Sequence, residues 1–121
     1  MKPNPKPTIL LVGSDATLSY LFGRFAERSG YQLTGNTATI SVEVIAVAKP
    51  AVIIFLSTEL LAKNQTLVAE LDSLDSPILV CSSIAEEARA KELGADYCLF
   101  HPLTLRDFQT ALVTMTTSKG V

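Results

Sequence analysis

The sequence predicts an α/β fold: a doubly wound, five-stranded parallel sheet with helices on both faces. Short apolar runs without polar alternation indicate strands that are covered on both sides. Turn or capping residues follow each run, and apolar residues at helical spacing come next. The 121 residues suit one domain, and 48% hydrophobic against 18% charged residues supply enough apolar surface for a core.

The first strand–turn–helix unit is the clearest. Thr8–Val12 is a continuous β-branched and aliphatic run, typical of a central strand. Gly13, Ser14 and Asp15 follow as turn and N-cap residues, and Asp15 is the expected cap. Apolar residues at helical spacing then continue until Gly30, where the helix is expected to end.

The same cycle repeats along the chain. The later strands are predicted at Tyr31–Thr34, Ala51–Leu56, Pro77–Cys81 and Tyr97–Phe100. The later helices are predicted from Thr39 or Ser41 to Lys49-Pro50, over Leu60–Leu71, over Ala85–Leu93 behind a Ser82-Ser83 cap, and from Thr104 to Met115.

Parallel neighbours need crossover connections, and right-handed crossovers leave few strand orders. The flavodoxin-like order 2-1-3-4-5 is a standard one for five strands. In such sheets ligands bind beyond the carboxyl ends of the strands. A functional site is therefore expected around Gly13–Asp15, Leu56–Thr58 and Ser82-Ser83.

The ends of the chain are expected to lie outside the domain. Pro3, Pro5 and Pro7 predict a flexible, extended arm over residues 1–7, followed by a domain over 8–117 and a flexible tail over 118–121. The arm lacks the apolar segment of a secretory signal, which favours a cytoplasmic location.

Composition excludes several functions. Twelve acidic against ten basic residues, with no basic run, argue against nucleic-acid binding. The longest strongly apolar stretch, Ala51–Leu56, is too short to span a membrane. Cys81 and Cys98 belong to no C-x-x-C or Cys/His cluster, so neither a disulfide nor a metal site is expected. No nucleophile–base set and no glycine-rich phosphate loop is recognisable, so the chain is not expected to be an enzyme and has no candidate catalytic residue.

Four segments carry a family resemblance: residues 9–12, 49–54, 77–83 and 94–103. The last reads Gly94-Ala95-Asp96-Tyr97-Cys98-Leu99-Phe100-His101-Pro102-Leu103. From about Thr8 to Met115 the chain resembles the receiver domain of two-component response regulators, whose corresponding segment is G-A-D-D-Y-L-x-K-P-F. The resemblance also implies a cis peptide bond between His101 and Pro102.

The resemblance implies a degenerate site. Receivers move a phosphoryl group onto an aspartate with the help of Mg²⁺, acidic residues, a hydroxyl and a lysine. The corresponding positions here are Leu56 for the phosphoacceptor, Gly13 and Ser14 for the acidic pair with Asp15 one place further on, Ser82 for the hydroxyl, His101 for the lysine and Cys98 for the aromatic residue. The sequence thus predicts a pseudo-receiver without phosphoacceptor, metal or cofactor.

Each of these residues also has a simpler interpretation. Asp15, Ser82 and Ser83 are expected to cap helices, because each precedes a helical run. His101 is expected to be structural or solvated. Cys98 is expected to be an unreactive core thiol.

Three functions follow as hypotheses. The first is a receiver-like domain in two-component or phosphorelay signalling that acts through a protein partner, possibly a second copy of itself, without phosphorylation. Its expected contact surface is the fourth helix, the fifth strand and the fifth helix, which carry Glu87, Lys91, Asp96 and Arg106. The second is a sensor that binds a small molecule or anion at the strand ends. The third is a phosphorylated receiver with an unorthodox site.

Overall fold

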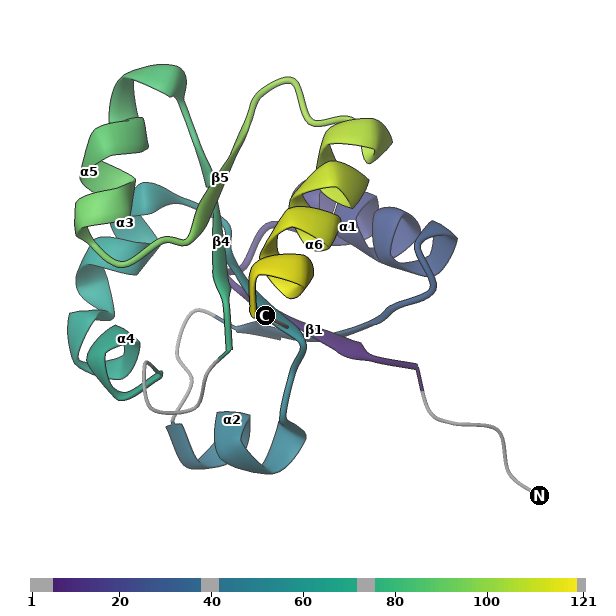
Figure 1. The fold of residues 1–121 in the computed structure, drawn as a ribbon, viewed down its shortest axis with the longest axis horizontal. Helices are drawn as coiled ribbons and strands as arrows, with labels where there is room; N and C mark the ends of the chain where they lie inside the picture. Colours follow the sequence, from purple (N-terminus) through teal and green to yellow (C-terminus); the bar gives the residue numbers. More distant parts are fainter. Residues whose placement is uncertain (1–5, 38–41, 72–75, 120–121) are drawn as a thin grey trace.

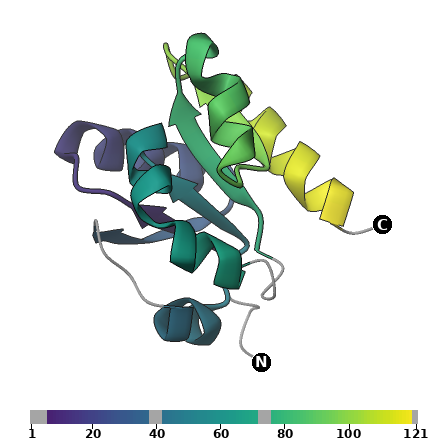
Figure 2. The ribbon, with the colours of Figure 1, turned by 90° about the vertical axis from the view of Figure 1, so that its left-hand side faces the viewer.

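The computed structural model describes residues 6–37, 42–71 and 76–119 and confirms the predicted architecture. Five parallel strands lie in the order β2-β1-β3-β4-β5, with helices on both faces (Figures 1 and 2). The strands are β1 Thr8–Val12, β2 Gln32–Thr37, β3 Val52–Phe55, β4 Ile78–Ser82 and β5 Tyr97–Phe100. The helices are α1 Ala16–Arg28, α2 Val42–Ala48, α3 Thr58–Lys63, α4 Gln65–Leu71, α5 Glu87–Glu92 and α6 Leu105–Lys119, with a 3₁₀ turn at Ile84–Glu86 before α5.

Two apolar clusters hold the layers together, one on each face of the sheet. Helices α1 and α6 cover one face (Figure 1), where the rings of Phe22, Phe25 and Phe108 pack edge-on or tilted with centroids 5.4–6.2 Å apart. Helices α2, α3, α4 and α5 cover the other face. Because β1, β3 and β4 are covered on both sides, their apolar side chains are buried in both directions.

Strand β2 is longer than predicted, because it extends beyond Thr34 to Thr37. Its pairing with β1 shifts register between Leu11 and Val12. Gly35 absorbs this irregularity with φ +91. A side chain there would meet Leu10 and the Leu11 carbonyl, so only glycine suits the position.

The single helix predicted over Leu60–Leu71 is instead two helices that meet at Asn64. The Asn64 side chain donates to the Leu60 carbonyl at 2.7 Å, and the Gln65 side chain donates to the Leu61 carbonyl at 2.9 Å. These amides take carbonyls that a continuous helix would bond to backbone N–H groups. The apolar residues keep their helical spacing across Asn64, so the sequence pattern did not reveal the break between the two helices.

Three smaller differences concern helix ends. The predicted caps Thr39 and Ser41 lie outside the described residues. The helix predicted over Ala85–Leu93 begins as a 3₁₀ turn and becomes α-helical only at Glu87. The last helix continues past Met115 to Lys119, although apolar periodicity stops at Met115.

Candidate functional site

The predicted site lies at the carboxyl edge of the sheet. Gly13 follows β1, Leu56 follows β3, Ser82 ends β4 and His101 follows β5, so the topology brings the four loops to one edge. Among the described residues, no three His, Cys, Asp or Glu side chains gather closely enough to hold a metal ion.

Leu56 closes the space beside Gly13. The Leu56 side chain is only 7% exposed and belongs to the core cluster on the α1 and α6 face. A Cβ atom built on Gly13 would lie 2.7 Å from Leu56 Cδ1, 2.8 Å from Cγ and 2.9 Å from Cβ. Gly13 also has φ +139, which L side chains rarely adopt. An acidic residue at position 13 therefore meets both a steric and a conformational obstacle while Leu56 is present.

Asp15 is a helix cap, as predicted. Its Oδ1 accepts a hydrogen bond from the Leu18 backbone N–H at 2.9 Å, and its extended backbone starts α1. Asp15 is thus the sole acid in the turn after β1, and one of its oxygens is engaged. Mg²⁺ binds through carboxylates together with waters and phosphate oxygens. The residues at this edge do not fit the Mg²⁺ ion that the family resemblance implies.

Ser82 does not cap a helix, so that prediction is wrong. It is the last residue of β4 and only 3% exposed, and its register partner is Phe100 of β5. Within ordinary hydrogen-bond geometry its Oγ has no partner among the described residues. The cap is Ser83 alone: Glu86 Oε1 accepts from the Ser83 N–H at 3.4 Å and from its Oγ at 3.3 Å.

Thr58 is a residue of this edge that sequence reasoning did not single out as buried. It opens α3, is 2% exposed, and its Oγ1 also lacks a partner among the described residues. Its neighbour Ser57 caps α3 by accepting from the Leu60 N–H at 3.1 Å. The sequence marked both as hydroxyls after a strand, but only the packing separates the half-buried cap Ser57 from the buried Thr58.

The two remaining positions are Cys98 and His101. Cys98 is buried, as predicted; burial raises the pKa of its thiol, while the adjacent Ser82 hydroxyl and Lys91 partly oppose that rise. His101 is exposed at the end of β5. The His101-Pro102 peptide bond is cis, as predicted.

Solved structures show where this fold occurs. The chain superposes with a TM-score of 0.74 on a response regulator receiver domain protein from Clostridium thermocellum, at 14% identity over 94% of this chain and 97% of that one. It superposes with a TM-score of 0.71 on a response regulator receiver domain protein from Methanospirillum hungatei, at 18% identity over 96% and 98% of the two chains. A response regulator from Thermotoga maritima gives 0.70 at 12% identity over 93% and 99%.

No protein-family model and no curated protein matches the sequence. At these identities the superpositions establish the fold, which is that of response regulator receiver domains. They cover nearly the whole of each chain, so the likeness is to a complete receiver domain. Among the described residues, no helix is long and apolar enough to cross a membrane.

Proposed function

We propose that the chain is a cytoplasmic receiver-like signalling domain, formed by residues 8–117, that works through protein contacts and without phosphorylation. The observation that carries this proposal is the packing of Leu56 against Gly13. In this arrangement an apolar side chain fills the space at the carboxyl end of β3, where the resemblance puts the phosphoacceptor.

The chemistry supports the same conclusion. Leucine has no atom that can attack a phosphoryl group, and the hydroxyls beside it need an activating base. Ser57 is engaged as a helix cap, and Thr58 is 2% exposed. The single histidine, His101, follows β5 and is solvent-exposed. We therefore propose a pseudo-receiver whose output depends on binding or abundance instead of a covalent mark.

The contact surface proposed for the partner is the face made by α5, β5 and α6. Lys91 and Arg106 are exposed there, and Glu87 is half-buried. Asp96, just before β5, links the starts of β4 and β5, because its Oδ2 accepts a hydrogen bond from the Ile78 N–H at 2.7 Å. Asp96 precedes β5 and Arg106 lies in the first turn of α6. Because α6 runs antiparallel to β5 (Figure 1), the two charges lie at opposite ends of this face.

Acetyl phosphate with Mg²⁺ tests the proposal by intact-mass measurement. The expected result is an unchanged mass, with a receiver that retains its aspartate as the positive control. A stoichiometric gain of one phosphoryl group would overturn the proposal and favour an unorthodox phosphorylation site. A thermal-shift screen with anions and nucleotides in the same buffer tests the sensor alternative, for which a concentration-dependent rise in melting temperature is the signature.

The contact surface has its own test. The oligomeric state is measured by light scattering for the native chain and for Arg106→Glu, with Glu27→Lys on α1 as the matched charge reversal elsewhere. If the chain self-associates, only Arg106→Glu is expected to weaken the association. Equal effects of both variants would move the surface away from α6.

A further inference from the structure

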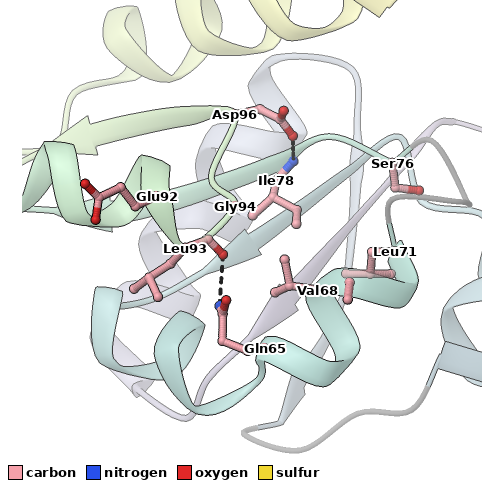
Figure 3. A pocket seen from close by; sticks show the side chains of 10 residues that line it. Gln65, Val68, Leu71, Ser76, Ile78, Glu92, Leu93, Gly94 and Asp96 are labelled. Atoms are coloured by element: carbon pink, nitrogen blue, oxygen red, sulfur yellow. Dashed lines mark hydrogen bonds between the residues drawn. The ribbon is translucent and has the colours of Figure 1, made fainter.

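A cavity of about 430 Å³ opens at the other end of the sheet, beside the amino ends of β4 and β5. It lies between α4 and the C-terminal end of α5 (Figure 3). Its described lining consists of Gln65, Val68, Ala69, Leu71, Ser76, Ile78, Glu92, Leu93, Gly94 and Asp96. The volume is within the range of small-molecule sites, which runs from about 300 to 1,000 Å³.

The floor of the cavity is apolar. Leu71 and Ile78 are buried core residues, and Val68 and Leu93 pack against the same cluster. Gly94 brings the backbone against Val68: it has φ +112, and a Cβ there would lie 2.6 Å from Val68 Cγ1. A short aliphatic chain would find van der Waals contacts along this floor.

The hydrogen-bond donors of the lining are already used. The Gln65 side-chain amide donates to the carbonyls of Leu61 and Leu93, each at 2.9 Å. The Ser76 hydroxyl donates to the Pro50 carbonyl at 3.4 Å.

Four backbone N–H groups of the lining are used as well. The N–H groups of Leu93 and Gly94 donate to backbone carbonyls within α5. The Asp96 N–H donates to the Ile78 carbonyl, and the Ile78 N–H donates to Asp96 Oδ2. A ligand that needs to accept hydrogen bonds thus meets no free donor among these groups.

Acceptors remain available. Asp96 uses Oδ2 for the Ile78 N–H, and its Oδ1 has no donor among the described residues. The Gln65 carbonyl oxygen is likewise free of described donors, and Figure 3 shows the amide between Leu93 and Val68. Glu92 stands on the rim with its carboxylate pointing outward, where it adds negative charge without a direct contact. The described lining contains no lysine, arginine or histidine.

We infer that this cavity binds a small aliphatic cation, namely a guanidinium or primary ammonium group on a short alkyl chain. These two head groups carry several donors and no acceptor, which complements a lining whose side-chain donors are used and whose Asp96 Oδ1 and Gln65 carbonyl oxygen have no described donor. The alkyl chain would lie on the floor formed by Val68, Leu71 and Ile78. This inference does not depend on the proposed function, because the cavity and the Leu56 edge lie at opposite ends of the sheet.

The test is a titration of the ¹⁵N-labelled chain with agmatine, which has a guanidinium and an ammonium group on one alkyl chain. Saturable amide shifts are expected at Gly94, Leu93 and Gln65. Butyrate and butanol, which keep the alkyl chain without the cation, are expected to cause no saturable shift. An arginine-containing tripeptide with blocked ends is a second arm: tighter binding than agmatine identifies a partner's side chain as the source of the cation, and weaker binding identifies a free metabolite.

Two variants test the assignment. Asp96→Asn keeps an oxygen for the Ile78 N–H but removes the charge, and it is expected to weaken agmatine binding about tenfold or more. Ala69→Phe, on the exposed wall of the cavity, is expected to abolish the shifts by filling the space while leaving every charge in place. Glu27→Gln on α1 is the matched loss of one exposed acid and is expected to leave binding unchanged.

The inference is overturned if agmatine shifts no lining residue, or if Glu27→Gln weakens binding as much as Asp96→Asn, because diffuse surface attraction then explains the data. Saturable binding that survives Ala69→Phe overturns it too. If Asp96→Asn does not fold, the Ala69→Phe result and the comparison of agmatine with butanol decide the matter.

Discussion

At each end of the sheet a glycine packs against an aliphatic side chain, but the space beside the glycine is filled at one end and open at the other. At the carboxyl end, Gly13 lies against the Leu56 side chain, and Leu56 fills the space beside it. At the amino end, Gly94 lies equally close to Val68, yet a cavity stays open next to it. Both glycines have positive φ, so the difference lies in what surrounds the contact.

The polar groups show the contrast most clearly. At the carboxyl end, the Thr58 hydroxyl is buried with no hydrogen-bond partner among the described residues, and such a group costs about 1–3 kcal/mol. At the open end, free acceptors such as Asp96 Oδ1 can still reach solvent. Strand order alone points to the carboxyl end as the place for ligands. Among the described residues, a cavity with acceptors that no described donor uses lies at the amino end.

The largest expected effect comes from putting a carboxylate into the closed end. Leu56→Asp is expected to lower the free energy of unfolding by about 3–5 kcal/mol, because it removes a packed side chain and buries an unpaired charge. Urea unfolding at neutral pH measures it. Val47→Asp is the matched control: Val47 is 85% exposed on α2, so its change is expected to stay within about 0.5 kcal/mol. Equal effects of the two variants would mean that Leu56 does not close the edge.

The second effect is a loss of stability in alkaline solution. Burial raises the pKa of the Cys81 thiol from 9.0 to about 12. Below pH 9 the thiol is protonated in both the folded and the unfolded chain, so its contribution is fully present. Between pH 9 and 12 only the unfolded chain ionises, and stability falls by up to about 1.4 kcal/mol per pH unit.

Comparing the native chain with Cys81→Ala isolates the contribution of Cys81 ionisation to the loss of stability. Urea unfolding at pH 7, 9 and 10.5 is expected to show a steeper decline for the native chain, since other alkaline titrations are common to both proteins. Parallel curves would indicate that water reaches Cys81 and that this part of the core is open.

The third effect is a coupling between Gly13 and Leu56. Gly13→Ala is expected to lower the free energy of unfolding by about 1–3 kcal/mol, because of the positive φ at this position and the clash with Leu56. A Leu56→Ala background removes the contacts with Leu56 Cδ1 and Cγ and keeps the one with Cβ, so the cost of Gly13→Ala is expected to fall by about 1 kcal/mol.

Gly30→Ala is the reference for the backbone part alone, because Gly30 has φ +81 and nothing within 4 Å of an added Cβ. Additive costs for Gly13→Ala and Leu56→Ala in the double variant would argue against the contact.

The smallest effect separates a helix cap from a metal ligand. Asp15→Ala is expected to cost about 1 kcal/mol, whereas Asp15→Ser keeps a capping oxygen for the Leu18 N–H and is expected to cost only a few tenths. Added Mg²⁺ is expected to leave the melting temperatures of all three proteins unchanged. A rise in melting temperature that needs both Mg²⁺ and Asp15 would show that the carboxyl end of the sheet binds the ion.

Much of the candidate site was predictable because its residues act locally. Asp15 accepts from the Leu18 N–H, and Ser83 forms a capping box with Glu86, in each case three residues further on, so the sequence pattern alone revealed both as caps. Ser82 misled the same reasoning, because its place in β4 depends on pairing with β5. The break at Asn64 was hidden for a related reason: side-chain amides compete for carbonyls there without disturbing the apolar spacing.

The sequence by itself determined the layers, the strand order and the uncharged residues that directly follow β1 and β3, since periodicity and residue identity can be read along one chain. Only the tertiary structure decided that Leu56 fills the space over Gly13, that Thr58 and Ser82 are buried, and that a cavity opens beside Gly94 with acceptors that no described donor uses. The physical reason is range. Strand and helix patterns depend on residues a few positions apart in the sequence. Cavities and unpaired polar atoms depend on how segments far apart in the sequence pack against one another.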